Sequence, residues 1–126
     1  MSHPMKAYQR VRITTASPGE IIVMLLEGLS RMGMKAADHL DEKRYPEAGG
    51  AVQRAIDIMT ALRESLNHDA APTLSKNLDT TYVRWSTCLL RAQAERDTAS
   101  IREIVRQIED VLTGWRQVVI RPGEHG

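Results

Sequence analysis

Aromatic residues are scarce in this sequence. Its 126 residues include no phenylalanine, three tyrosines and two tryptophans. The core must therefore consist of Ala, Leu, Ile, Val and Met, which suit closely packed helices better than the aromatic and Thr-rich faces of sheets. A chain of this length forms one domain and buries about two-thirds of its unfolded surface. An all-β fold is therefore not expected.

Cysteine, net charge and long apolar runs are scarce as well. Cys88 is the single cysteine, so no intramolecular disulfide can form and a reducing compartment is expected. The net charge of +1 gives no long-range attraction to nucleic acid or to an anionic membrane. No apolar run approaches the roughly 20 residues that span a bilayer, and the first residues lack a signal-peptide core. We expect a soluble, cytoplasmic protein with no nucleic-acid partner and no direct membrane insertion.

Four segments show the apolar spacing of amphipathic helices. The first begins at a capping box, Ser17-Pro18-Gly19-Glu20, and its apolar face continues to Leu40. The others are expected from Tyr45 to Asn67, from Pro72 to Glu95, and from Asp97 or Thr98 to a stop at Arg121-Pro122-Gly123. Short connections favour antiparallel neighbours. The sequence predicts an all-α, antiparallel up-down-up-down four-helix bundle over residues 17–120, with a mobile N-terminal segment over residues 1–16 and a disordered tail over residues 121–126.

Two glycines interrupt the apolar face of the first predicted helix. Gly28 and Gly33 each lower helix propensity by about 1 kcal/mol. Such glycines are expected where another helix comes close.

Residues suited to catalysis or metal binding do not form a recognisable pattern. No Glu stands three residues before a His, as a di-iron bundle requires, and no phosphate loop, zinc spacing or nucleophile elbow occurs. Asp38 and Asp41 flank His39, but a solvated acidic helix end is the preferred interpretation. Cys88 has no base among its neighbours and is interpreted as a packed thiol. We predict no enzymatic activity, no cofactor and no metal.

The helices carry more apolar residues than one buried stripe needs. Ile56 and Ile58, or Val118 and Val119, cannot both point to the bundle axis, so some must face a groove or another chain. Two interpretations stay open. Broad stripes can serve a homodimer, or they can receive amphipathic helices of a partner protein.

An ordered set of residues extends from Ala7 almost to the end of the last predicted helix. It comprises Ala7-Tyr8, Thr15-Ala16-Ser17-Pro18, Ile22, Met24-Leu25, Gly28, Arg54-Ala55, Ile58, Leu62, Leu66, Lys76-Asn77-Leu78-Asp79, Tyr82, Leu89, Ala92, Asp97, Leu112 and Trp115. In order and spacing this set resembles the FliS family, the flagellin-specific export chaperones of the flagellar type III secretion system. Leu26, Asn67 and Gln93 depart from the residues usual in that family, which are Tyr, Asp and Asn.

The resemblance implies a cytoplasmic chaperone that binds the disordered C-terminal region of flagellin, prevents its premature polymerisation and presents it to the export gate protein FlhA. It also implies that the guest lies in apolar grooves and that the N-terminal segment covers part of that surface. Ordering a guest typically costs a few kcal/mol, offset by burial of roughly 1,000–3,000 Å². The expected partner-binding residues are Tyr8, Ile13, Ile58, Leu62, Leu78, Tyr82, Val111, Leu112 and Trp115.

Each of these residues has a competing role, and Tyr82 and Trp115 also lie on the predicted core stripes. The alternative functions are a structural or dimerisation bundle and a divergent chaperone for another flagellar protein.

Overall fold

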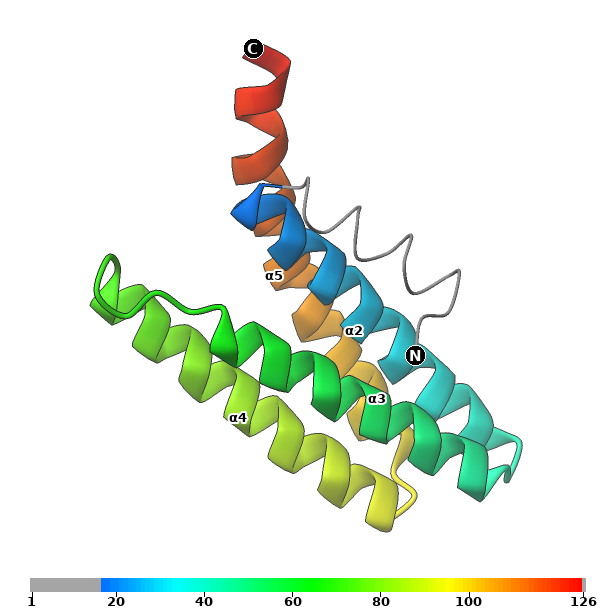
Figure 1. Ribbon diagram of the computed structural model, residues 1–126. Helices are drawn as coiled ribbons and strands as arrows, with labels where there is room; N and C mark the ends of the chain where they lie inside the picture. Colours follow the sequence, from blue (N-terminus) through cyan, green and yellow to red (C-terminus); the bar gives the residue numbers. More distant parts are fainter. Residues whose placement is uncertain (1–16, 126) are drawn as a thin grey trace, which may run out of the picture.

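The chain is all-helical over the residues that the structure describes. The structure is a computed structural model, which describes the backbone of residues 17–125 and the side chains of residues 17–119. It contains four α-helices and, within that part, no strand: α2 (Pro18–Asp41), α3 (Tyr45–Glu64), α4 (Pro72–Ala94) and α5 (Thr98–His125) (Figure 1). The predicted all-α class is confirmed. The segment 1–16, with the candidates Tyr8 and Ile13, lies outside the described residues.

The starts of α2 and α5 follow the predicted capping signals. The Ser17 hydroxyl accepts a hydrogen bond from the Glu20 amide at 3.2 Å, and the Glu20 carboxylate accepts one from the Ser17 amide at 2.9 Å. This reciprocal pair satisfies two amides that the first turn of α2 leaves without helical partners. Asp97, one of the two residues predicted to cap α5, likewise accepts a bond from the Ser100 amide at 3.1 Å.

Two helix ends differ from the sequence expectation. Helix α3 ends at Glu64 rather than Asn67, because the Asn67 side chain accepts a hydrogen bond from the Ala70 amide at 3.0 Å and closes a turn instead. Helix α5 continues through Pro122 to His125, beyond the stop predicted at Arg121-Pro122-Gly123. The stop is predicted because an interior proline removes one backbone hydrogen bond and its ring clashes with the preceding turn; nothing in the structure explains why the helix nevertheless continues.

Each helix has two principal neighbours. Helix α2 packs closely against α3 and α5, and α4 packs less closely against the same two helices. In Figure 1 consecutive helices run in opposite directions, and the pair α2–α5 diverges from the pair α3–α4 toward the end that carries the α3–α4 loop. The four helices therefore enclose a common core at one end and separate at the other.

The core is mainly aliphatic, but it includes two aromatic rings. Trp85 and Tyr82 are each only 1% exposed and are the largest fully buried side chains. Their ring centroids lie 5.9 Å apart with planes tilted by 53°, a geometry within the favourable range for aromatic pairs. The indole Nε1 of Trp85 donates to Gln107 Oε1 at 3.0 Å, which satisfies the buried donor and joins α4 to α5. The two rings therefore add to the Ala, Leu, Ile, Val and Met that the composition predicts.

The two glycines of α2 lie where other helices approach. A Cβ atom built on Gly33 would stand 2.6 Å from Val105 Cγ2 on α5, and one on Gly28 would stand 3.4 Å from Ile58 Cδ1 on α3. The contact at Gly33 is too short for a real Cβ, whereas the contact at Gly28 is close to ordinary van der Waals distance. The expectation of a close helix approach is confirmed, most clearly at Gly33.

Candidate functional site

An apolar groove of about 340 Å³ lies among α2, the α3–α4 connection, α4 and α5. Its walls come from the start of α2, the loop that follows α3, the first half of α4, and one residue of α5. The lining residues are Pro18, Gly19, Ile21, Ile22, Ser65, Leu66, Asn67, Ala71, Leu74, Ser75, Leu78, Tyr82 and Trp115. We call this surface the end groove, because it lies where the helix pairs diverge in Figure 1.

The local structure of the α3–α4 connection shapes one side of the end groove. The hydroxyl of Ser65 donates to the carbonyl of Leu62 at 2.7 Å, just beyond the end of α3. The hydroxyl of Ser75 donates to the carbonyl of Asn67 at 2.9 Å and ties the loop to α4. Because Pro72 has no amide hydrogen and a fixed φ, it suits the first turn of α4. These contacts hold the loop beside the groove.

The groove has a buried floor and an open rim. Tyr82 is 1% exposed and Ser75 is 3% exposed, whereas Leu74 at the rim is 53% exposed. Leu78 and Trp115 are half-buried and pack against the core. Burial raises the pKa of the Tyr82 hydroxyl to about 12, so this group is neutral at physiological pH.

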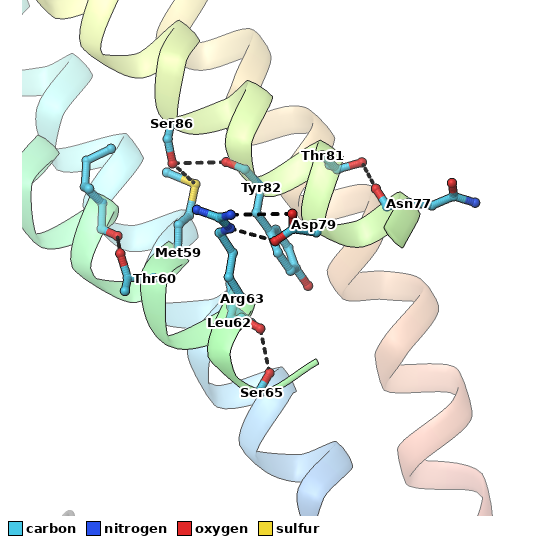
Figure 2. Close-up of polar contacts among 11 residues, drawn as sticks. Met59, Thr60, Leu62, Arg63, Ser65, Asn77, Asp79, Thr81, Tyr82 and Ser86 are labelled. Carbon is cyan, nitrogen blue, oxygen red and sulfur yellow. Dashed lines mark hydrogen bonds and ion pairs between the residues drawn. The ribbon is translucent and has the colours of Figure 1, made fainter. Parts of the chain in front are cut away.

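Three charged side chains near the groove are engaged by neighbouring residues, and none of them lines it. The guanidinium of Arg63 lies 2.6 Å from the carboxylate of Asp79 and joins α3 to α4 (Figure 2). This hydrogen bond lowers the pKa of Asp79 and raises that of Arg63. At the start of α2, hydrogen bonds from Ser17 lower the pKa of Glu20. The end groove therefore presents aliphatic surface with ionised groups outside its lining.

The structure places three of the sequence-predicted partner residues together in the end groove: Leu78, Tyr82 and Trp115. Ile58 is half-buried beside Gly28, between α2 and α3, and Val111 is half-buried against the core. Leu62 and Leu112 are buried, with 0% and 1% exposure. The last two have no surface to offer a partner in this conformation.

Sequence reasoning did not assign several groove residues to partner contact. Pro18, Ile21, Ile22, Leu66 and Leu74 all line the end groove. They lie on or beside the helical apolar stripes, and residues on such stripes are ordinarily buried. The signal that could have found them is their position at helix ends, next to the longest connection between helices.

Other candidate chemistry is accounted for by local contacts. One nitrogen of Arg102 binds the carboxylates of both Asp38 and Asp41, at 3.0 and 2.8 Å, and bridges α5 to the end of α2. Within residues 17–119, no three His, Cys, Asp or Glu side chains are grouped to hold a metal ion. Cys88 is half-buried in a shallow pocket with Arg91 and Glu95.

None of the described helices has the length and hydropathy to cross a membrane.

Fold and groove together define an all-helical protein with an apolar groove and no recognisable catalytic centre within the described residues. The model of a known family, the flagellar protein FliS, matches residues 1–122. The chain therefore belongs to the FliS family.

Three relatives illustrate this membership. The chain is 30% identical to flagellar secretion chaperone FliSB of Pseudomonas aeruginosa over 115 residues, which cover 88% of this chain and 91% of the relative. It is 26% identical to flagellar secretion chaperone FliS of Bacillus subtilis, over 100% of this chain and 95% of the relative. It is 24% identical to flagellar secretion chaperone FliS of Vibrio cholerae, over 94% of this chain and 90% of the relative. The similarity extends over nearly the full length of every chain compared.

Proposed function

We propose that this chain is a flagellar secretion chaperone that binds the disordered C-terminal region of flagellin in the cytoplasm. In this role it prevents premature polymerisation and delivers its guest to the type III export apparatus. Family membership and the names of the relatives support the chaperone role. The observation that carries the binding proposal is the end groove. It has a volume of about 340 Å³, is lined mainly by apolar side chains and is open to solvent at its rim.

The groove is suited to apolar side chains of a guest segment. Ile22, Leu78 and Trp115 are half-buried, so each retains apolar surface that a guest can cover. Burying one leucine or isoleucine of the guest contributes roughly 1.5–3 kcal/mol before the cost of ordering the segment. A few such side chains are needed, because the ordering cost is of similar size.

The scaffold that we propose is the antiparallel up-down-up-down bundle. The cyclic pairing of α2, α3, α4 and α5 and the alternating helix directions in Figure 1 support it. On the family resemblance we further propose that the loaded chaperone is presented to FlhA. The same resemblance suggests that the N-terminal segment, with Tyr8 and Ile13, competes with the guest.

The binding proposal is tested by titrating the full chain with a peptide covering the C-terminal helices of flagellin from the same organism. Isothermal calorimetry should detect binding at tens of micromolar or tighter. Leu74→Glu should weaken it by tenfold or more, because a carboxylate at the groove rim must then be desolvated. Leu90→Glu is a matched control: Leu90 lies on the same helix and is 50% exposed, but it does not line the groove.

Three outcomes decide the proposal. If Leu74→Glu loses peptide affinity while Leu90→Glu keeps it, and both variants unfold at the same temperature as the unchanged protein, the end groove is supported as the flagellin site. Absence of binding by the unchanged protein refutes the chaperone proposal. A stable homodimer in light scattering, whose mass does not change when the peptide is added, would favour the structural bundle instead.

A further inference from the structure

The hydroxyl of Tyr82 belongs to a buried residue and has no acceptor among the residues that the structure describes. Tyr82 is 1% exposed and the most buried residue of the end-groove lining. Its backbone carbonyl accepts a hydrogen bond from the Ser86 hydroxyl at 3.0 Å, but no bond from its own phenol is found within residues 17–119. Figure 2 shows the ring with its oxygen free of any dashed line. Among the side chains of residues 17–119, only His39 Nδ1 is fully enclosed without a hydrogen-bond partner, so the Tyr82 hydroxyl, although its residue is buried, remains accessible to water in the free protein.

The serine and asparagine side chains of the groove lining are already engaged or exposed. The Ser65 hydroxyl donates to the carbonyl of Leu62, and the Ser75 hydroxyl donates to the carbonyl of Asn67. Asn67 is an exposed residue, so water can reach its side chain. Tyr82 therefore supplies a side-chain donor at the floor of the described lining that a bound segment can still use, alongside the indole N–H of the half-buried Trp115.

We infer that the Tyr82 hydroxyl is a specificity-determining donor of the end groove, which selects a guest segment that presents a neutral hydrogen-bond acceptor among aliphatic side chains. The acceptor is an amide or carbonyl oxygen of the guest, placed at the groove floor. A guest carboxylate would have to be desolvated among Ile22, Leu78 and Trp115 with no cation in the lining. This inference rests on the proposed function, because it describes how that guest is recognised.

The chemistry of the phenol fits this role. A tyrosine hydroxyl keeps its proton in the physiological range even at its ordinary pKa of 10.0, and burial raises the pKa of Tyr82 further, to about 12. The ring is held against Trp85 at a centroid distance of 5.9 Å, so the donor position is set before a guest arrives. A purely apolar guest would exclude water from the hydroxyl without replacing its hydrogen bond, and it would bind less well.

The test compares Tyr82→Phe with Tyr45→Phe in calorimetric titrations with the same flagellin peptide. Tyr45 is a matched control because its ring lies under Arg96 in the first turn of α3 and does not line the end groove. Tyr82→Phe should bind the peptide about three- to tenfold more weakly, with a less favourable enthalpy, as expected for the loss of one neutral hydrogen bond. Tyr45→Phe should bind like the unchanged protein.

Thermal unfolding of the free proteins gives the second readout. Because the hydroxyl has no partner within residues 17–119, Tyr82→Phe should unfold at the same temperature as the unchanged protein or higher. Equal peptide affinity of the unchanged protein and Tyr82→Phe would refute the inference while leaving the chaperone proposal intact. A clearly lower thermal midpoint for Tyr82→Phe would also refute it, by showing that the hydroxyl is bonded within the free chain. If the unchanged protein does not bind the peptide, the proposed function fails and this inference fails with it.

Discussion

Replacing Gly33 by alanine should destabilise this protein, although alanine is the better helix former. Gly33 is buried within α2, and the added Cβ would stand 2.6 Å from Cγ2 of Val105 on α5. Val105 is only 6% exposed, and a valine in a helix has essentially one χ1 rotamer. The valine therefore cannot rotate away, and α2 and α5 must move apart to accept the methyl group.

The magnitude follows from two opposing effects. Gly→Ala in a helix stabilises by about 1 kcal/mol, whereas forcing a methyl group into a well-packed interface typically costs about 1–3 kcal/mol. The net change at Gly33 is therefore roughly zero to 2 kcal/mol of destabilisation. Gly114 is the matched control, because it is an exposed residue of α5 and a Cβ there would meet no atom within 4 Å. Gly114→Ala should raise the free energy of unfolding by about 1 kcal/mol.

Thermal unfolding followed by circular dichroism at the helix band measures the difference. For a chain of this size 1 kcal/mol corresponds to about 4 °C in the midpoint, so the two variants should differ by about 4–12 °C. In a Val105→Ala background the obstructing methyl is gone, and Gly33→Ala should then stabilise the protein. If Gly33→Ala and Gly114→Ala raised the thermal midpoint by the same amount, the close approach of α2 and α5 would be refuted.

Two further predictions concern a helix end and an ion pair. Lys43 follows α2 with a φ of 61°, a left-handed conformation that favours glycine. Lys43→Gly should therefore raise the free energy of unfolding by roughly 0.5–1 kcal/mol in urea denaturation, and Lys43→Ala should not. Arg63 lowers the pKa of Asp79 below its ordinary value of 3.8, so the ionised pair stabilises the folded state above that value and the contribution disappears as pH falls through the lowered pKa. The difference in thermal midpoint between the unchanged protein and Asp79→Asn should accordingly be present at pH 7 and shrink as the pH falls below 3.8; a constant difference would contradict the pairing.

Much of the helical organisation could be predicted from local sequence. Ser17 with Glu20 and the cap Asp97 act over three residues, so the backbone conformation they favour does not depend on distant parts of the chain. The apolar spacing that places Leu26, Leu29 and Leu112 inward is also local, and all three are buried. Family membership, too, could be inferred from the order and spacing of residues along the chain.

The candidate site could be predicted only in part. Leu62 and Leu78 share the same kind of apolar spacing, yet Leu62 is buried and Leu78 lines the end groove. Spacing identifies the face of a helix on which a residue lies, but not the distance to the neighbouring helix at that point. Leu74 departs from the pattern in the opposite direction: its position on an apolar stripe predicts a buried side chain, but it is 53% exposed at the groove rim.

The sequence by itself therefore determined the helical class, the helix starts and the family, because capping, periodicity and ordered motifs act along the chain. Only the tertiary structure decided where the helix pairs diverge and which apolar side chains border the resulting groove. It alone also revealed that Tyr82 lies at the floor of that groove with no acceptor for its hydroxyl within the described residues. These properties depend on helix separation and on contacts between residues far apart in the chain, which a one-dimensional pattern does not encode.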